Sequence, residues 1–283
     1  MTPESIRKNN GRILALLSQY INLCPDAITP EMMEETVRYC GVGEEEAFRI
    51  LISGILDVFE DKELRGGWIS KMFTRLDREK YENDPYKKTI KLPSARLGEW
   101  EFTVDRYKPY EAFVYNDLRA EADGRIIPQI GFFDGEYAFP CVKQAGREWM
   151  LITPNEIETM AAPVETSWGK VLTYGLGLGY FAFMASEKET VESVTVVELE
   201  QSVIDLFTSH ILPQFPHGEK IKIVKASAFE FAKEAEGFDF VFADIWHDPS
   251  DGCEAYLRLK KEEKPNTRYA YWIEDTLKYY LSL

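Results

Sequence analysis

Three closely spaced glycines form the feature of this chain with the clearest chemical meaning. The run Gly175-Leu176-Gly177-Leu178-Gly179 comes directly after an apolar segment and directly before a helical pattern. Glycines at such a turn let a ligand approach the backbone, and the next helix offers free N–H groups and the positive end of its dipole. The loop therefore predicts a site for a nucleoside-containing ligand.

A carboxylate follows at the end of the next apolar segment. An acid at the position of Glu198 is placed to accept hydrogen bonds from both hydroxyls of a ribose. A dinucleotide fingerprint would carry a third glycine at the sixth place of the loop, where this chain has Tyr180. The spacing favours an adenosyl sulfonium compound over NAD.

A third group of polar and aromatic side chains follows the apolar segment 238–245. Asp244 could take a proton from an amine, orient the amine for in-line attack on a sulfonium carbon, or orient a ligand without catalysis. Trp246 is suited to stacking on an adenine or covering a cation. His247 is either a general base or an ordinary loop histidine, and Asp248 either adds negative charge near a cationic acceptor or forms a turn.

These loops require a sheet whose strand ends meet at one edge. Apolar segments 171–175, 193–199, 221–226 and 238–245 alternate with helical patterns over 181–186 and 201–211. Such alternation is typical of an α/β, Rossmann-like parallel sheet covered on both faces. Since only 283 − 245 = 38 residues follow Ile245, we expect a truncated sheet of four or five strands. The segment from Asn266 reads as a capped helix, with one short strand over 271–273 as the alternative.

The preceding half of the chain has other periodicities. Helical patterns cover 5–24, a segment from Thr29-Pro30, and 44–60, whereas alternation over 100–104, 112–115, 137–142 and 148–152 indicates a small antiparallel β unit. A capping box at Thr153-Pro154 predicts a helix that ends before Pro163. We predict four segments: a helical domain 1–83, a linker 84–97, a small β unit 98–152 and a Rossmann-like domain 153–283.

Composition narrows the range of partners. Acidic residues exceed basic ones by 48 − 33 = 15, so the chain repels phosphate backbones and anionic lipid. The four cysteines form no C-x-x-C pair, and the three histidines do not form a zinc-binding pattern. We therefore expect a cytoplasmic protein without a bound metal. No apolar run is long enough to span a membrane. We expect a small-molecule acceptor, such as an amine, and a homodimer through the helical domain.

Four segments together resemble a known class: VLTYGLGLGY, VTVVELEQSVIDLF, IKIVKASAFEF and FDFVFADIWHDPSDG. Over about residues 145–260 the chain is similar to S-adenosylmethionine-dependent methyltransferases, and most similar to their spermidine-synthase-like branch. The resemblance implies that Gly175, Gly177 and Gly179 hold the methionine part, and Glu198 the ribose. It also implies contacts from Tyr174 and Leu199 beside these residues, from Ser227 and Ala228 to the adenine edge, and from Asp244 to the reacting amine or the cofactor's amino end.

Three functions are compatible with these residues. The first is methyl transfer from S-adenosylmethionine to a small-molecule acceptor. The second is aminopropyl transfer, although Ser227-Ala228 stands where polyamine synthases carry Asp-Gly or Asp-Ala, and the loop after Asp244 is one residue longer. The third is cofactor binding without turnover, with the helical domain recruiting a partner.

Overall fold

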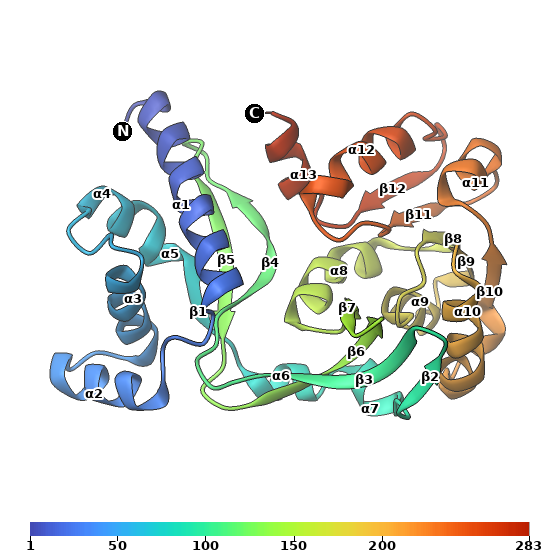
Figure 1. The fold of residues 1–283 in the computed structure, drawn as a ribbon. Helices are drawn as coiled ribbons and strands as arrows, with labels where there is room; N and C mark the ends of the chain where they lie inside the picture. Colours follow the sequence, from blue (N-terminus) through green and yellow to red (C-terminus); the bar gives the residue numbers. More distant parts are fainter. Residues whose placement is uncertain (283) are drawn as a thin grey trace. The chain divides into compact units, whose positions relative to one another are not determined.

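The computed structural model describes residues 1–282 and divides the chain into two compact units (Figure 1). The first unit comprises Met1–Glu79 and Arg106–Ala138, and the second comprises Lys80–Asp105 and Phe139–Leu283. Each unit is therefore built from two separate stretches of sequence. Among the described residues, no helix is both long and apolar enough to cross a membrane.

The first unit combines helices with a small sheet. Its elements are α1 (Pro3–Leu23), α2 (Pro30–Cys40), α3 (Glu44–Ile55), α4 (Lys62–Leu64), a π-helical turn (Arg65–Ile69), α5 (Ser70–Met72), β1 (Phe73–Arg75), β4 (Phe113–Ala120) and β5 (Ile126–Phe132). Strand β5 is central, parallel to β1 and antiparallel to β4. Buried Asn10 joins the layers, because its amide oxygen accepts bonds from Trp68 Nε1 and the Ile126 N–H, each at 3.0 Å.

The second unit begins with segments that sequence analysis assigns to a linker and to a separate β unit. After α6 (Arg78–Glu82), which spans the boundary, come α7 (Pro85–Thr89), β2 (Ala95–Leu97), β3 (Trp100–Tyr107), β6 (Tyr137–Gln144) and β7 (Arg147–Leu151). The four strands form a sheet in the order β2-β3-β6-β7. Tyr86 is fully buried and donates its hydroxyl to the Leu178 carbonyl at 2.6 Å. The segment 84–97 thus contributes Tyr86 and Ile90 to the core.

The predicted domain boundaries therefore do not coincide with the compact units. Strands β4 and β5 pack with the N-terminal helices, whereas β2, β3, β6 and β7 belong mainly to the second unit. The physical reason is that alternation predicts strands but not their partners, since each face can pack against any apolar layer.

A five-stranded, all-parallel sheet forms the centre of the second unit. Its elements are α8 (Pro154–Thr166), β8 (Gly169–Tyr174), α9 (Tyr180–Ser186), β9 (Val191–Glu198), α10 (Gln201–Leu206), β10 (Ile221–Lys225), α11 (Ala228–Glu234), β11 (Phe240–Ala243), α12 (Pro249–Lys260), β12 (Arg268–Tyr271) and α13 (Glu274–Leu281). The order is β10-β9-β8-β11-β12. The predicted Rossmann-like α/β fold is confirmed, with five strands.

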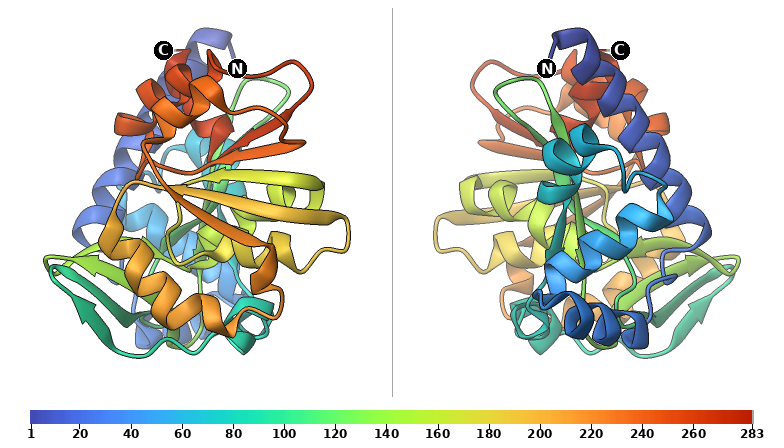
Figure 2. Two further views of the ribbon diagram at one scale, coloured as in Figure 1. Left: turned by 90° about the vertical axis from the view of Figure 1, so that its right-hand side faces the viewer. Right: turned by 90° about the vertical axis from the view of Figure 1, so that its left-hand side faces the viewer.

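Helices lie on both faces of this sheet, as Figures 1 and 2 show. Val171 and Phe242 point into the core shared with α8, α9 and α10, while Leu172 and Val241 point into the core shared with α11, α12 and α13. Alternate residues of one strand therefore enter different cores. This explains the nearly continuous apolar runs that mark these strands in the sequence.

Several local predictions need correction. Helix α8 does not end before Pro163 but continues to Thr166. Pro163 removes only one backbone N–H donor from the helix, and its ring is buried in the protein. The predicted helix from Asn266 begins as strand β12, which pairs in parallel with β11, and becomes helical only at Glu274. Helix α12 was not predicted, although Asp248-Pro249 is a cap followed by proline.

Candidate functional site

A cavity in the second unit opens at the carboxyl ends of its parallel strands. Its volume is about 600 Å³, within the usual range for small-molecule sites. Strand order reverses between β8 and β11, the first and fourth strands of the sheet. Open α/β sheets bind ligands at such a switch point. The fold thus places the glycine loop, which follows β8, beside Asp244, which follows β11.

Glycine is structurally required in the loop after β8. Gly175 has φ +95°, and a Cβ there would overlap the carbonyl oxygen of Asp244. Gly179 has φ +76° and begins α9, where a Cβ would overlap the ring of Phe207. Close approach of two strand ends and of a helix therefore explains these residues without any ligand. Gly175 and Gly177 nevertheless line the cavity.

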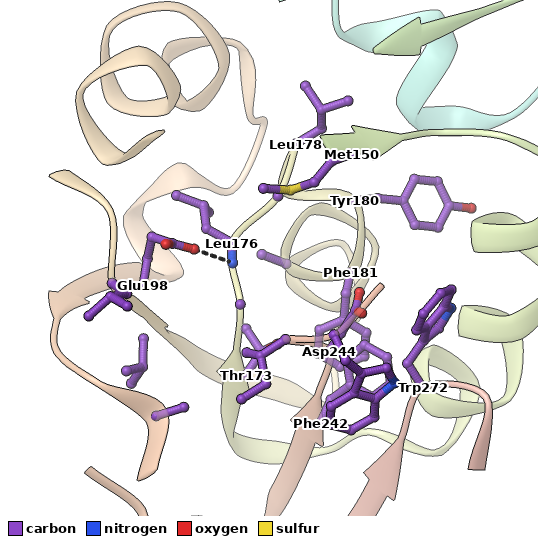
Figure 3. A pocket seen from close by; sticks show the side chains of 18 of the residues that line it. Met150, Thr173, Leu176, Leu178, Tyr180, Phe181, Glu198, Phe242, Asp244 and Trp272 are labelled. Atoms are coloured by element: carbon purple, nitrogen blue, oxygen red, sulfur yellow. Dashed lines mark hydrogen bonds between the residues drawn. The ribbon is translucent and has the colours of Figure 1, made fainter. Parts of the chain in front are cut away.

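Glu198 ends β9 and turns toward the glycine loop (Figure 3). One carboxylate oxygen accepts the Leu176 N–H at 3.0 Å, and the other accepts the Glu200 N–H at 2.8 Å. Each carboxylate oxygen can accept more than one hydrogen bond. The backbone therefore fixes the carboxylate in the cavity wall and leaves acceptor capacity for two hydroxyl groups.

Asp244 has a different environment. Its side chain is half-buried beside Phe181, Phe242 and Trp272, and it forms no hydrogen bond with any residue that the structure describes (Figure 3). Removal from water, reinforced by the negative charge of Glu156, raises the pKa of Asp244 to about 8. A carboxyl group in this state gains most from a cationic ligand, which would stabilise its charged form.

Glu156 lies in the first turn of α8 and also lines the cavity. It completes the predicted capping box, since it accepts the Thr153 N–H at 3.1 Å and is hydrogen-bonded to the Thr153 hydroxyl. Burial nevertheless raises the pKa of Glu156. The helix cap thus places a second acid near Asp244.

The antiparallel sheet supplies part of the cavity rim. Trp149 of β7 contacts the ring of His247 edge to face, with centroids 4.4 Å apart. His247 Nδ1 lies 3.0 Å from Asp251 Oδ2. Burial tends to raise the pKa of Asp251, but hydrogen bonds from His247 and the Asp248 N–H outweigh this and lower it.

Most residues predicted for the site line the cavity. They are Gly175, Gly177, Glu198, Leu199, Ser227, Ala228, Asp244, Trp246 and His247. The structure does not bring three others to the cavity wall. Tyr174 packs in the core shared with α11 to α13, Gly179 is the N-cap of α9, and Asp248 is the N-cap of α12. Trp246 is only 5% exposed and lies in the same core as Tyr174.

Sequence reasoning missed several acidic and aromatic lining residues. Glu148 and Trp149 come from β7, Glu156 from α8, and Trp272 follows β12. Burial, with the nearby charge of Asp105, raises the pKa of Glu148. The capping box at Thr153 was a signal for Glu156, but only as a structural residue. No local pattern indicates the others, because the cavity gathers them from separate elements.

Comparison with known proteins shows what this region is similar to. Residues 154–268 match the family model of the spermine/spermidine synthase domain. The sequence of this part of the chain thus resembles a spermine/spermidine synthase domain. The predicted resemblance to the spermidine-synthase-like branch is thereby confirmed, and the match supports an enzyme of the S-adenosylmethionine-binding fold. No curated protein sequence matches the chain.

Solved structures resemble the chain over part of its length. A spermidine synthase from Thermotoga maritima is 19% identical, covering 47% of this chain and 48% of its own, with a TM-score of 0.34. The O-methyltransferase TomG from Streptomyces achromogenes is 18% identical, with coverages of 36% and 47% and a TM-score of 0.29. A precorrin 8W decarboxylase from Methanobacterium thermoautotrophicum is 15% identical, with coverages of 40% and 58% and a TM-score of 0.32. The chain thus spans about half the length of these proteins.

Proposed function

We propose that this protein is a transferase that binds an adenosyl sulfonium nucleoside and transfers its alkyl group to an amine. One observation carries the proposal: the described residues that line the cavity include five carboxylic acids and no lysine or arginine. The acids are Glu148, Glu156, Glu198, Glu200 and Asp244. Such a cavity attracts sulfonium and ammonium groups and disfavours the pyrophosphate of NAD.

The donor set fits this ligand. Glu198 would accept the two ribose hydroxyls, since the backbone already fixes its carboxylate. The backbone of Gly175 and Gly177 would approach the amino-acid or aminopropyl tail, and Ser227 and Ala228 would border the adenine. Burial of the apolar parts of the ligand in the cavity would supply most of the remaining affinity.

The bound sulfonium would supply an electrophilic carbon, so the protein's task is to position the nucleophile and exclude water. Asp244 would attract the amine and accept its N–H, which orients the nitrogen lone pair toward the reacting carbon. Phe181, Phe242 and Trp272 lie beside this carboxylate and reduce its contact with solvent. Because a cationic ligand stabilises the charged form, binding should release a proton from Asp244 near neutral pH.

Two donors remain to be distinguished. Methyl transfer from S-adenosylmethionine is the reaction predicted from the sequence. The absence of lysine and arginine from the described cavity lining favours the second candidate, aminopropyl transfer from the decarboxylated donor, because neither of these permanently cationic side chains is present there to pair with the carboxylate of S-adenosylmethionine.

The test is calorimetric titration of the purified protein with S-adenosylmethionine, its decarboxylated form and NAD. We expect both sulfonium compounds to bind, the decarboxylated one more tightly, and NAD not to bind. Titrations of the wild-type protein in two buffers of different ionisation enthalpy should show that ligand binding releases a proton. This proton release should be absent in the Asp244→Asn variant. Binding of NAD alone, or of no compound, would contradict the proposal.

A further inference from the structure

A single carboxylate at the cavity rim fixes both the ring and the main chain of His247. Nδ1 of the ring lies 3.0 Å from Asp251 Oδ2. The His247 backbone N–H donates to the same carboxylate, at 3.1 Å to one oxygen and 3.2 Å to the other. Asp251 also accepts the Asp248 N–H at 3.1 Å as part of the α12 capping box. His247 is therefore preorganised by the start of α12.

The other ring nitrogen of His247 is available. Nε2 forms no hydrogen bond with any part of residues 1–282 that the structure describes, and the side chain is 47% exposed. A carboxylate facing Nδ1 favours the tautomer of the neutral ring that carries its proton on Nδ1, and in this tautomer the Nε2 lone pair can accept a proton. His247 thus has the orientation of a base.

Aromatic rings border this base. Trp149 contacts the His247 ring at an interplanar angle of 79°, and Trp100 contacts Trp149 with centroids 5.5 Å apart. Trp149 is 38% exposed, so part of its surface faces solvent beside the cavity. Indole faces attract ammonium groups. The rim therefore combines a surface for a cationic amine with an acceptor for its proton.

We propose that an amine acceptor docks beside Trp149 and that His247, oriented by Asp251, takes the proton which this amine loses. The inference rests on the proposed function and deepens it. The amine nitrogen forms a bond to the alkyl carbon while the carbon–sulfur bond breaks, and sulfur keeps the electron pair as a neutral thioether. One N–H proton passes to Nε2 and then to water. Asp244, which lies beside apolar side chains, attracts and orients the amine.

The test uses nuclear magnetic resonance of the full-length protein with ¹⁵N-labelled histidine. Only three histidines are present, so single substitutions assign every signal. We expect His247 to carry its proton on Nδ1 at neutral pH, and Asp251→Asn to abolish this preference. Asparagine retains an oxygen for the capping bonds, so α12 should stay folded. Addition of butylamine or putrescine to the protein saturated with S-adenosylhomocysteine should shift Nε2 of His247 and leave His210 and His217 unchanged.

A matched control exists on the same unit. His217 Nδ1 also faces an acid, Glu219 Oε1 at 3.5 Å, and its side chain is 44% exposed, but it does not line the cavity. With saturating donor and these amines, His247→Gln should lower the transfer rate about 100-fold without changing the donor dissociation constant. His217→Gln should change neither the transfer rate nor the donor dissociation constant.

Three results would overturn the inference: a proton on Nε2 in the free protein, no response of His247 to either amine, or undiminished transfer by His247→Gln. Each differs from failure of the proposed function, which would appear as no binding of either sulfonium donor to the wild-type protein.

Discussion

Two carboxylates lie at the same edge of one sheet, yet their surroundings differ. Glu198, after β9, accepts two backbone N–H groups, whereas Asp244, after β11, accepts no hydrogen bond from the described residues. The backbone holds the first carboxylate in place. The second is shifted toward its neutral form, with a pKa of about 8, and needs an external cation. Residue type and strand position therefore do not define a carboxylate's role; its partners do.

The largest expected effect comes from disturbing both carboxylates at once. Gly175→Ala would place a Cβ against the Asp244 carbonyl at φ +95°, next to the Leu176 N–H that binds Glu198. We expect the free energy of unfolding to fall by about 3–5 kcal/mol, measured by urea denaturation.

Gly54→Ala is the control, because Gly54 lies inside α3 with open space around it. Its unfolding free energy should rise by about 0.5–1 kcal/mol. Equal stability of the two variants would show that the strand ends near Gly175 are not closely packed.

The next largest expected effect is on ligand binding, where a charged and an uncharged ligand distinguish the role of Asp244 from that of Glu198. Asp244→Asn should weaken binding of S-adenosylmethionine about 100-fold, because a partly desolvated charge pair is lost. Binding of uncharged methylthioadenosine should change less than about threefold. Calorimetry with both ligands measures the difference. Equal losses for the two ligands would mean that Asp244 does not attract the positive charge of the ligand.

Glu198→Ala should show the opposite pattern. Both ligands carry the ribose, so both should bind about 10-fold more weakly, since a hydrogen-bonded carboxylate is lost from a preorganised site. Two backbone N–H groups also lose their acceptor. The same calorimetric experiment measures this change, and selective loss of the charged ligand alone would reverse our assignment of the two acids.

The smallest expected effect is on the way the free energy of unfolding changes with pH. The pKa of Asp244 is raised in the folded protein, so between about pH 4 and 8 the folded state binds more protons than the unfolded state, and wild-type stability falls as pH rises. The advantage of Asp244→Asn over wild type should therefore grow, by about 1 kcal/mol from pH 5 to pH 7 after allowance for partial exposure. Urea denaturation at both values tests this. A constant difference would indicate an unshifted carboxyl group.

The contrast between the two acids also shows what the sequence can predict. Glycine loop, Glu198 and Asp244 each follow an apolar strand, and parallel strands bring their carboxyl ends to one edge, so local patterns were sufficient to place them together. Whether each acid is paired depends on backbone N–H directions and neighbouring side chains. These come from tertiary packing and leave no local signal.

The same limit applies to the cavity rim. Trp149 and Glu148 lie on β7, and sequence alternation predicted this strand without indicating which layer it would meet. Asp248 was weighed as a turn residue or a source of charge, and it instead caps α12. Trp246 was expected to meet a ligand, but its bulk packs in a core.

The interleaved order of the two units affects how the chain folds during synthesis. Domains generally fold as they leave the ribosome, amino end first. Here the first unit is completed only by residues 106–138, after part of the second unit has already been made. Residues 80–105 of the nascent chain therefore cannot pack in their final positions until the later strands are translated. Until then the side chains of Tyr86, Trp100 and Phe102 remain exposed. Expression of residues 139–283 alone should give an aggregating fragment.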